Sequence, residues 1–242
     1  MTLTIIIFSI ALLPSLVWLL FYLKEDPPPE PPRWLWLAFF LGIGSAPVSF
    51  YLEKWALELA STIGKISTQT VSENILFMFF GIAFVEEVVK FIAARLLLAK
   101  NPVFDEPVDA MIYLITIALG FAAFENILIL QSSAAAGRLD QAIQTIVLRF
   151  IGANFLHTLS SGLIGYYWAL GIIERRVPKR LGMGIFLATS LHAGFNLLII
   201  NFGAGYLVTT TLLLFIVGLM VIHDFEILKR LKTPATQVRK QL

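Results

Sequence analysis

The chain has 242 residues, of which 58% are hydrophobic and 14% are charged, and its mean hydropathy is +0.83. Soluble domains carry about 25% charged residues, so this composition excludes an ordinary soluble domain and indicates an integral membrane protein. The net charge of only +2 gives no sign of a nucleic-acid-binding surface. The absence of cysteine excludes disulfides, thiolate zinc sites and thiol nucleophiles.

Seven apolar segments follow one another along the chain, each close to the roughly 20 residues that a membrane-spanning helix needs. The first lacks the basic start and small-residue cleavage site of a signal peptide, so we expect it to be retained. The predicted fold is an all-α polytopic membrane bundle of about seven transmembrane helices with a polar site inside it. The predicted spans are Leu3–Leu23, Trp34–Tyr51, Ile75–Leu98, Val108–Gln131, Ile143–Ile172, Leu181–Ile200 and Tyr206–His223.

The connections between these spans predict the orientation of the protein in the membrane. Thirteen of the 18 lysine and arginine residues lie on the side of the proline-rich Lys24–Arg33 loop, and three lie on the other side. Because cytoplasmic loops carry the excess of positive charge, we expect a multi-pass protein of the plasma membrane with its N-terminus outside and its C-terminus in the cytoplasm. Glu53–Gln69 mixes polar and apolar residues, which predicts a short amphipathic helix in the lipid interface.

The third span contains Glu86, Glu87 and Lys90. Glu86 and Lys90 are four residues apart and therefore share a helix face on which they can pair. An ion pair that only fixes helix packing explains these two residues and leaves Glu87 unexplained. Ionisable residues within a membrane span are costly and point to function, so we take this pair of carboxylates as the start of a candidate site.

Three further spans carry polar residues at helical spacing. Asp109 begins the fourth span, where its charge favours the N-terminal end of a helix. Arg149 lies near the outer end of the fifth span, and we expect it to extend to the interface. The polar residues expected inside the bundle are Glu125 and Asn126 in the fourth span, Asn154, His157, Ser160 and Ser161 in the fifth, and His192 and Asn196 in the sixth.

These residue types support hydrolysis by two routes. A carboxylate can act as general base toward water, while histidine and asparagine stabilise the oxyanion that forms when water adds to a carbonyl. Alternatively, His157 and His192 with Glu86, Glu87 or Glu125 can hold zinc, which activates a bound water. The residues leave both routes open. Two other classes remain as alternatives: a non-catalytic membrane scaffold or assembly subunit, and a proton-coupled carrier, although the inverted repeat and broken helices typical of carriers are not evident.

The ordered set of motifs resembles the PrsW family of intramembrane proteases over about residues 75–200. The motifs are Glu86-Glu87-Val-Val-Lys90, Phe121-Ala-Ala-Phe-Glu125-Asn126, a mid-span His157 and His192-Ala-Gly-Phe-Asn196. The family is related to the type II CAAX prenyl endopeptidases, whose first two motifs are EExxxR and FxxxH. This chain has Lys90 one residue earlier than that arginine and Glu125 in place of that histidine.

The resemblance implies an endopeptidase that acts on membrane-anchored proteins such as anti-sigma factors. Family members are classed both as metalloproteases and as glutamate proteases, so zinc is neither required nor excluded. We expect residues 1–242 to form one integral membrane domain, with a protease-like core at about 75–200 and peripheral helices at 3–23, 34–51 and 206–223. The implied roles are water activation by Glu86 tuned by Glu87, positioning of water or zinc by His157 and His192, oxyanion stabilisation by Asn196, and support from Lys90, Glu125, Asn126 and Asn154.

Overall fold

The computed structural model describes residues 2–26, 29–62, 74–99, 103–202 and 207–231. The regular structure of these residues is helical, which confirms the predicted all-α bundle. The elements are α1 (Thr2–Tyr22), η1 (Leu23–Glu25), α2 (Pro32–Thr62), α3 (Ile75–Phe77), the π-helical turn η3 (Met78–Ala83), α4 (Phe84–Leu98), α5 (Asp109–Ala135), α6 (Leu139–Ile151), α7 (Ala153–Glu174), α8 (Val177–Phe202) and α9 (Leu207–Arg230).

The described residues include six helical stretches that are long and apolar enough to cross a membrane. They comprise α1, α2, α5, the α6–α7 pair, α8 and α9. The remaining predicted span forms a continuous rod of α3, η3 and α4, with the acidic pair near its middle. Many large apolar side chains on the outer faces are exposed, including Phe40, Phe80 and Phe186, as expected for helices surrounded by lipid.

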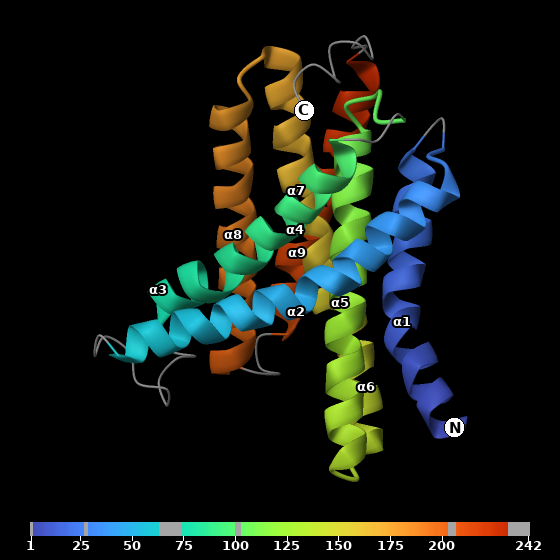
Figure 1. Ribbon diagram of the computed structural model, residues 1–242, viewed down its shortest axis with the longest axis vertical. Helices are drawn as coiled ribbons and strands as arrows, with labels where there is room; N and C mark the ends of the chain where they lie inside the picture. The colour runs from blue at the N-terminus through green and yellow to red at the C-terminus, as the bar shows by residue number, and fades with distance from the viewer. Residues whose placement is uncertain (1, 27–28, 63–73, 100–102, 203–206, 232–242) are drawn as a thin grey trace.

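Helix α5 is the centre of the bundle. Figure 1 shows α1, α5, α8 and α9 running along the length of the molecule, while α2 and the α3–α4 rod incline across it. Almost the whole first two thirds of α5 is buried, from Asp109 to Ala123. A helix buried on all sides is expected to be apolar all round, and this one carries Glu125 just past that buried stretch.

Two glycines let α2 cross α5 with the backbones in direct contact. A Cβ added to Gly120 would lie 2.0 Å from the carbonyl oxygen of Phe39, and one added to Gly42 would lie 2.0 Å from that of Ile117. Small residues allow this close approach between membrane helices. The crossing fixes α2 against α5 less than two turns before Glu125.

The second predicted span ends too early, and the interfacial helix predicted at Glu53–Gln69 is wrong over the residues described. Helix α2 continues without interruption to Thr62, and residues 63–69 lie outside the described part. The charges in this extension pair one turn apart, which lets a mixed sequence remain helical. Lys54 pairs with Glu58 at 3.9 Å on the exposed side, while Glu53 accepts a hydrogen bond from Ser49 at 2.8 Å.

The single fifth span predicted at Ile143–Ile172 is also divided in the structure. Gly152 separates α6 from α7, with backbone angles of φ −89° and ψ −96° that lie outside the α-helical region. Helix α6 carries its charged and polar residues on one side, and α7 lies nearly buried in the core. The break changes the direction of the chain between Arg149 and His157.

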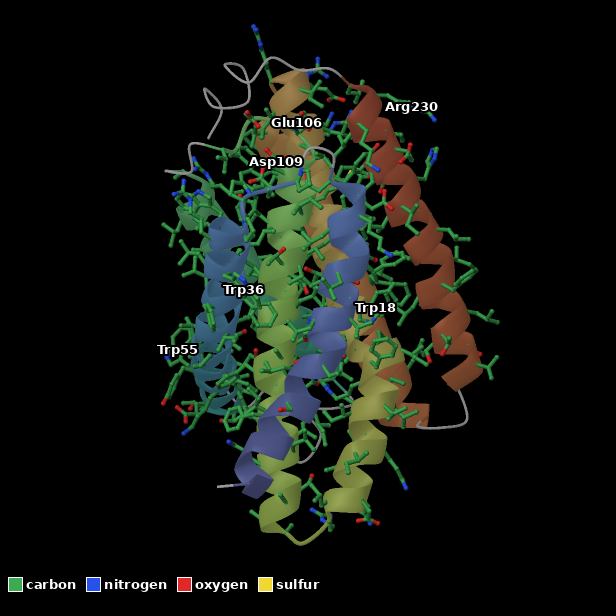
Figure 2. The ribbon with its side chains drawn as sticks, turned by 90° about the vertical axis from the view of Figure 1, so that its right-hand side faces the viewer. Trp18, Trp36, Trp55, Glu106, Asp109 and Arg230 are labelled. Atoms are coloured by element: carbon green, nitrogen blue, oxygen red, sulfur yellow. The ribbon has the colours of Figure 1, made fainter. Side chains whose placement is uncertain are left out.

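One end of the bundle holds a cluster of buried acidic residues. Asp109 lies in the first turn of α5 as predicted and accepts hydrogen bonds from the backbone N–H groups of Asp105 and Glu106. Glu30, in the connection before α2, accepts a hydrogen bond from Tyr113 at 2.5 Å. Burial raises the pKa of Glu30 to about 7 and that of Asp26 to about 6. Figure 2 shows Glu106, Asp109 and Arg230 toward this same end.

Candidate active site

The acidic pair of α4 is buried at the centre of the bundle. Glu86 is 6% exposed, and Glu87 and Lys90 are fully buried. The Lys90 ammonium lies 2.7 Å from Glu87 Oε1 and 3.5 Å from Glu86 Oε2. The preceding π-helical turn of η3 adds a residue to the helix, and such turns occur frequently at functional sites. The lysine pairs more closely with Glu87, three residues away, than with Glu86, four residues away.

The carboxylate of Glu87 is held by three donors from three helices. Its Oε1 accepts hydrogen bonds from Lys90 at 2.7 Å, from Ser160 of α7 at 3.0 Å and from Nδ1 of His192 on α8 at 2.8 Å. Because an ionised carboxylate only accepts, Nδ1 of His192 must carry the hydrogen. In the neutral imidazole this leaves Nε2 of His192 as an acceptor, 3.8 Å from Glu86 Oε2.

His157 has the opposite tautomer, and its partners fix it. Lys90 Nζ lies 2.9 Å from Nδ1 of His157, and an ammonium only donates. Nε2 therefore carries the hydrogen and donates it to Glu125 Oε2 at 3.0 Å. The two imidazole rings lie edge to face with centroids 5.1 Å apart. One lysine thus connects the acidic pair of α4 to the histidine of α7 and, through it, to α5.

Arg149 completes the polar cluster, and the expectation that it extends to the interface is wrong. Its Nη2 donates to Glu125 Oε2 at 2.8 Å and its Nε donates to the side-chain oxygen of Asn126 at 2.6 Å. A buried carboxylate needs a cationic partner, and Glu125 obtains it from α6 because the chain changes direction at Gly152. The sequence offers one signal for this contact, because Glu125 has no cationic residue at helical spacing in its own span.

Helix α1 also contributes to the site. The Asn126 amide donates to the backbone oxygen of Ala11 and to the side-chain oxygen of Asn154, each at 3.1 Å. Asn154 in turn donates to Ser15 at 2.9 Å. The two asparagines therefore tie α5 and α7 to α1. Sequence reasoning placed both asparagines in the polar site but did not anticipate their partners on the first helix.

Two predicted polar residues lie outside this hydrogen-bonded cluster. Asn196 borders a cavity that also touches Arg149, and within the described residues no hydrogen bond joins it to either glutamate of α4 or to either imidazole. Ser161 is fully buried, and its hydroxyl oxygen has no hydrogen-bond partner among the described residues. Asn196 therefore lies near the site, but no hydrogen bond to these residues holds its side chain in place.

The site carries more negative than positive charge. Glu86, Glu87 and Glu125 supply three carboxylates, against the two cations Lys90 and Arg149. Glu53 of α2 lies within electrostatic reach of Glu86 and Glu125 and adds to the excess. Buried charge has to be compensated, so neutrality requires protons on these groups or a bound cation.

Glu86, His157 and His192 are suited to hold such a cation. Each offers one ligand atom, and the three atoms lie within 4.8 Å of one another. The oxygen Glu86 Oε2 is buried and makes no hydrogen bond to a described residue, and Nε2 of His192 is an open acceptor. Three protein ligands with a free fourth position are typical of catalytic zinc. A ring nitrogen of His157 would join only by giving up its bond to Lys90 or to Glu125.

An apolar bundle that encloses carboxylates and imidazoles within its spanning helices defines an integral membrane protein with a buried glutamate–histidine site. A family model described as PrsW family intramembrane metalloprotease matches residues 30–222, and the chain belongs to this family. It is an intramembrane protease, which acts in a lipid bilayer on a membrane-associated substrate. The predicted family resemblance is confirmed, and the match extends beyond the predicted core to include α2 and most of α9.

Three relatives, each described as Protease PrsW, show how far the similarity extends. The protein of Geobacillus kaustophilus (strain HTA426) is 28% identical and covers 74% of this chain and 73% of its own length. The protein of Clostridioides difficile (strain 630) is 25% identical, and the match covers 80% of this chain and 79% of the relative's length. The protein of Bacillus subtilis (strain 168) is 24% identical, and the match covers 74% of this chain and 75% of the relative's length. No solved structure shows a significant match to this chain.

Proposed function

We propose that Glu86 is the general base of the protease and that Glu87 holds its neighbours in position. The observation that carries this assignment is the difference between the two carboxylates. Glu87 accepts three hydrogen bonds at Oε1 and keeps only its Oε2 without a partner among the described residues, whereas Glu86 Oε2 makes no such hydrogen bond, lies 3.5 Å from the Lys90 ammonium and faces His192 Nε2 at 3.8 Å. A base has to be free to receive a proton, and Glu86 meets that condition.

The geometry favours a water molecule between Glu86 and His192. Both Glu86 Oε2 and His192 Nε2 accept hydrogen bonds, so one water can donate a hydrogen to each and direct a lone pair at the substrate carbonyl. Glu86 takes the proton as the water oxygen bonds to the carbonyl carbon. It returns the proton to the amide nitrogen as the peptide bond breaks. Asn196, one turn after His192, donates to the oxyanion of the tetrahedral intermediate.

The same residues fit a zinc ion, held by Glu86, His157 and His192. When bound, zinc would lower the pKa of water and polarise the carbonyl. The chain's own contribution is then to orient the ligands. Glu87 fixes the tautomer and direction of the His192 ring, and Glu125 does the same for His157 if Nδ1 of that ring leaves Lys90 to hold the ion. Partners of this kind orient ligands in known metal sites.

Glutamine variants test the roles of the two glutamates. In proteoliposomes with a membrane-anchored peptide, we expect Glu86→Gln to lower cleavage by about 100- to 10,000-fold, the range for loss of a general base. Glu87→Gln should also destabilise the fold, because the amide oxygen can still accept but no longer carries the charge that pairs with the buried Lys90. Glu174→Gln, in an exposed ion pair with Arg180, is the matched control and should leave cleavage unchanged. Undiminished cleavage by Glu86→Gln would remove the proposal.

We also propose that the substrates are membrane-anchored proteins of the anti-sigma-factor type.

The proposed orientation in the plasma membrane has the N-terminus outside, and it is supported by the basic connections gathered at one end of the bundle (Figure 1). Because the chain has no cysteine, single cysteines report topology directly. An impermeant maleimide should label Gly137→Cys in intact cells, but Arg176→Cys only after lysis. The reverse pattern would invert the proposed orientation.

A further inference from the structure

A cavity of about 470 Å³ lies between α6, α7, α8 and α9 and is also bordered by Ile129 of α5. This volume falls in the usual range for small-molecule pockets, about 300–1,000 Å³. Arg149 and Asn196 stand among mostly apolar walls, to which three threonines also contribute: Thr145, Thr210 and Thr211. The apolar walls include Ile129, Leu148, Phe195, Ile199 and Leu214.

The cavity is connected to the candidate active site through two helices. Arg149 lines the cavity and also donates to Glu125, which accepts the hydrogen bond from His157. On α8, Asn196 lines the cavity one turn after His192, which binds Glu87. A group that entered the cavity would therefore contact Asn196, to which we assign the oxyanion, and Arg149, whose partner Glu125 holds His157.

The break in the chain at Gly152 forms one wall of this space. A Cβ added to Gly152 would lie 3.2 Å from the ring of Phe195 and 3.1 Å from the carbonyl oxygen of Leu148. A side chain at this position would therefore intrude between α7 and α8. The absence of a side chain at the α6–α7 junction keeps the wall open, and the same junction turns Arg149 toward Glu125.

We propose that this cavity receives a large apolar side chain of the substrate next to the scissile bond. The inference rests on the protease site proposed above. The walls suit an aliphatic or aromatic side chain, while Arg149 and Asn196 suit the peptide carbonyls that accompany it. A guanidinium has five N–H donors, and two of them are used by Glu125 and Asn126. A lipid acyl chain carries no acceptor for such donors.

The selectivity of the pocket should come mainly from shape. Lipid tails are as apolar as a leucine side chain, so transfer from the bilayer into the cavity provides little hydrophobic gain. A methylene that fits or fails to fit a pocket changes specificity by about 10- to 200-fold. We therefore expect about tenfold preference for leucine, isoleucine, methionine or phenylalanine over alanine and glycine at one position beside the cleaved bond.

The test uses the full chain in vesicles of phosphatidylethanolamine and phosphatidylglycerol. The probe is a mixture of single-span peptides randomised at the membrane boundary, with cleavage sites read by mass spectrometry. Ile199→Trp fills the cavity and should shift the preference toward alanine and glycine. Ile200→Trp is the matched control, because Ile200 is 51% exposed on the outer face of the same helix, and it should keep the wild-type preference.

The outcomes separate this inference from the proposed function. Continued cleavage by Ile199→Trp with an unchanged preference would overturn the pocket and leave the protease assignment intact. Absence of cleavage by the wild type would overturn the proposed function itself. If Ile199→Trp fails to fold, Phe195→Ala enlarges the cavity and should extend the preference to tryptophan, and an unchanged preference there overturns the pocket. A lipid that co-purifies with the wild type and is lost in Ile199→Trp, without a change in preference, would assign the cavity to an acyl chain.

Discussion

Removing one partner of the ion pair between Arg149 and Glu125 should destabilise the fold strongly, because the other charge is left buried, and the loss can be measured. The two side chains are 19% and 18% exposed and lie 2.8 Å apart. Breaking a buried ion pair costs about 3–5 kcal/mol, whereas an exposed pair contributes about 0–1 kcal/mol. Glu125 keeps His157 as a second donor, which reduces the loss. We therefore expect Arg149→Met to lower the free energy of unfolding by about 2–3 kcal/mol, below the full buried-pair cost.

A double-mutant cycle isolates the pairwise part of this energy. Glu125→Gln, Arg149→Met and the double variant should give a coupling energy of about 1–3 kcal/mol. Unfolding by SDS in mixed micelles can be followed by fluorescence, because the chain has five tryptophans. The exposed pair of Glu174 and Arg180, 32% and 33% exposed, provides the matched cycle and should couple by less than about 1 kcal/mol. Equal coupling in the two cycles would refute the reasoning.

Three further results are expected. Because the pKa values of Glu30 and Asp26 are raised to about 7 and about 6, their protonated forms stabilise the fold. That stabilisation is complete below about pH 4 and is lost as the pH rises through 6 to 7, so the unfolding temperature should fall between pH 5 and pH 8. Glu30→Gln should flatten the dependence, and an unaltered slope would contradict this. Gly120→Ala, whose Cβ would lie 2.0 Å from a backbone oxygen, should lower the free energy of unfolding by about 1–3 kcal/mol or more. Gly44→Ala, with open space around it, should not lower it. Similar losses in the two variants would contradict the close crossing of α2 and α5. Elemental analysis of the purified protein separates the two routes: one zinc per chain that is lost in His192→Ala supports the metal site, whereas full cleavage after exhaustive chelation assigns the chemistry to the side chains alone.

The sequence was sufficient to predict the bundle and to locate the residues of the candidate site. Span length and apolar composition predicted the helices, because the bilayer core has a fixed thickness. The cost of ionisable groups in lipid singled out Glu86, Glu87 and Lys90, since such residues need partners inside the protein. The structure brings these residues together with His157 and His192, although their catalytic roles remain proposals.

What the sequence could not predict depends on contacts between helices distant in the chain. The distinction between Glu86 and Glu87 arises from Ser160 and His192, which donate hydrogen bonds to Glu87 and not to Glu86. Spacing along α4 alone treats both glutamates as partners of Lys90. The tautomers of the imidazoles likewise follow from partners on other helices.

Local backbone irregularities were the other source of error. A glycine inside an apolar run has no signature that distinguishes a helix break from a continuous span, so Gly152 was read as part of one long helix. That reading placed Arg149 on a straight extension toward the interface, when the change of direction turns it toward Glu125. The polar residues after Tyr51 favour an end to the second span, but α2 stays helical to Thr62 because charges in this stretch pair one turn apart.

The hydrogen bonds from Asn126 and Asn154 to α1 have a consequence for biogenesis. Translation produces α1 before α5 and α7, so the acceptors on Ala11 and Ser15 are already in the bilayer when the two amides are inserted. Each amide can then form its hydrogen bond as soon as its helix is inserted, and is not left without an acceptor in the hydrocarbon. Defects in α1 should therefore appear first as reduced yield of inserted protein in the cell, before any effect on the turnover of the molecules that mature.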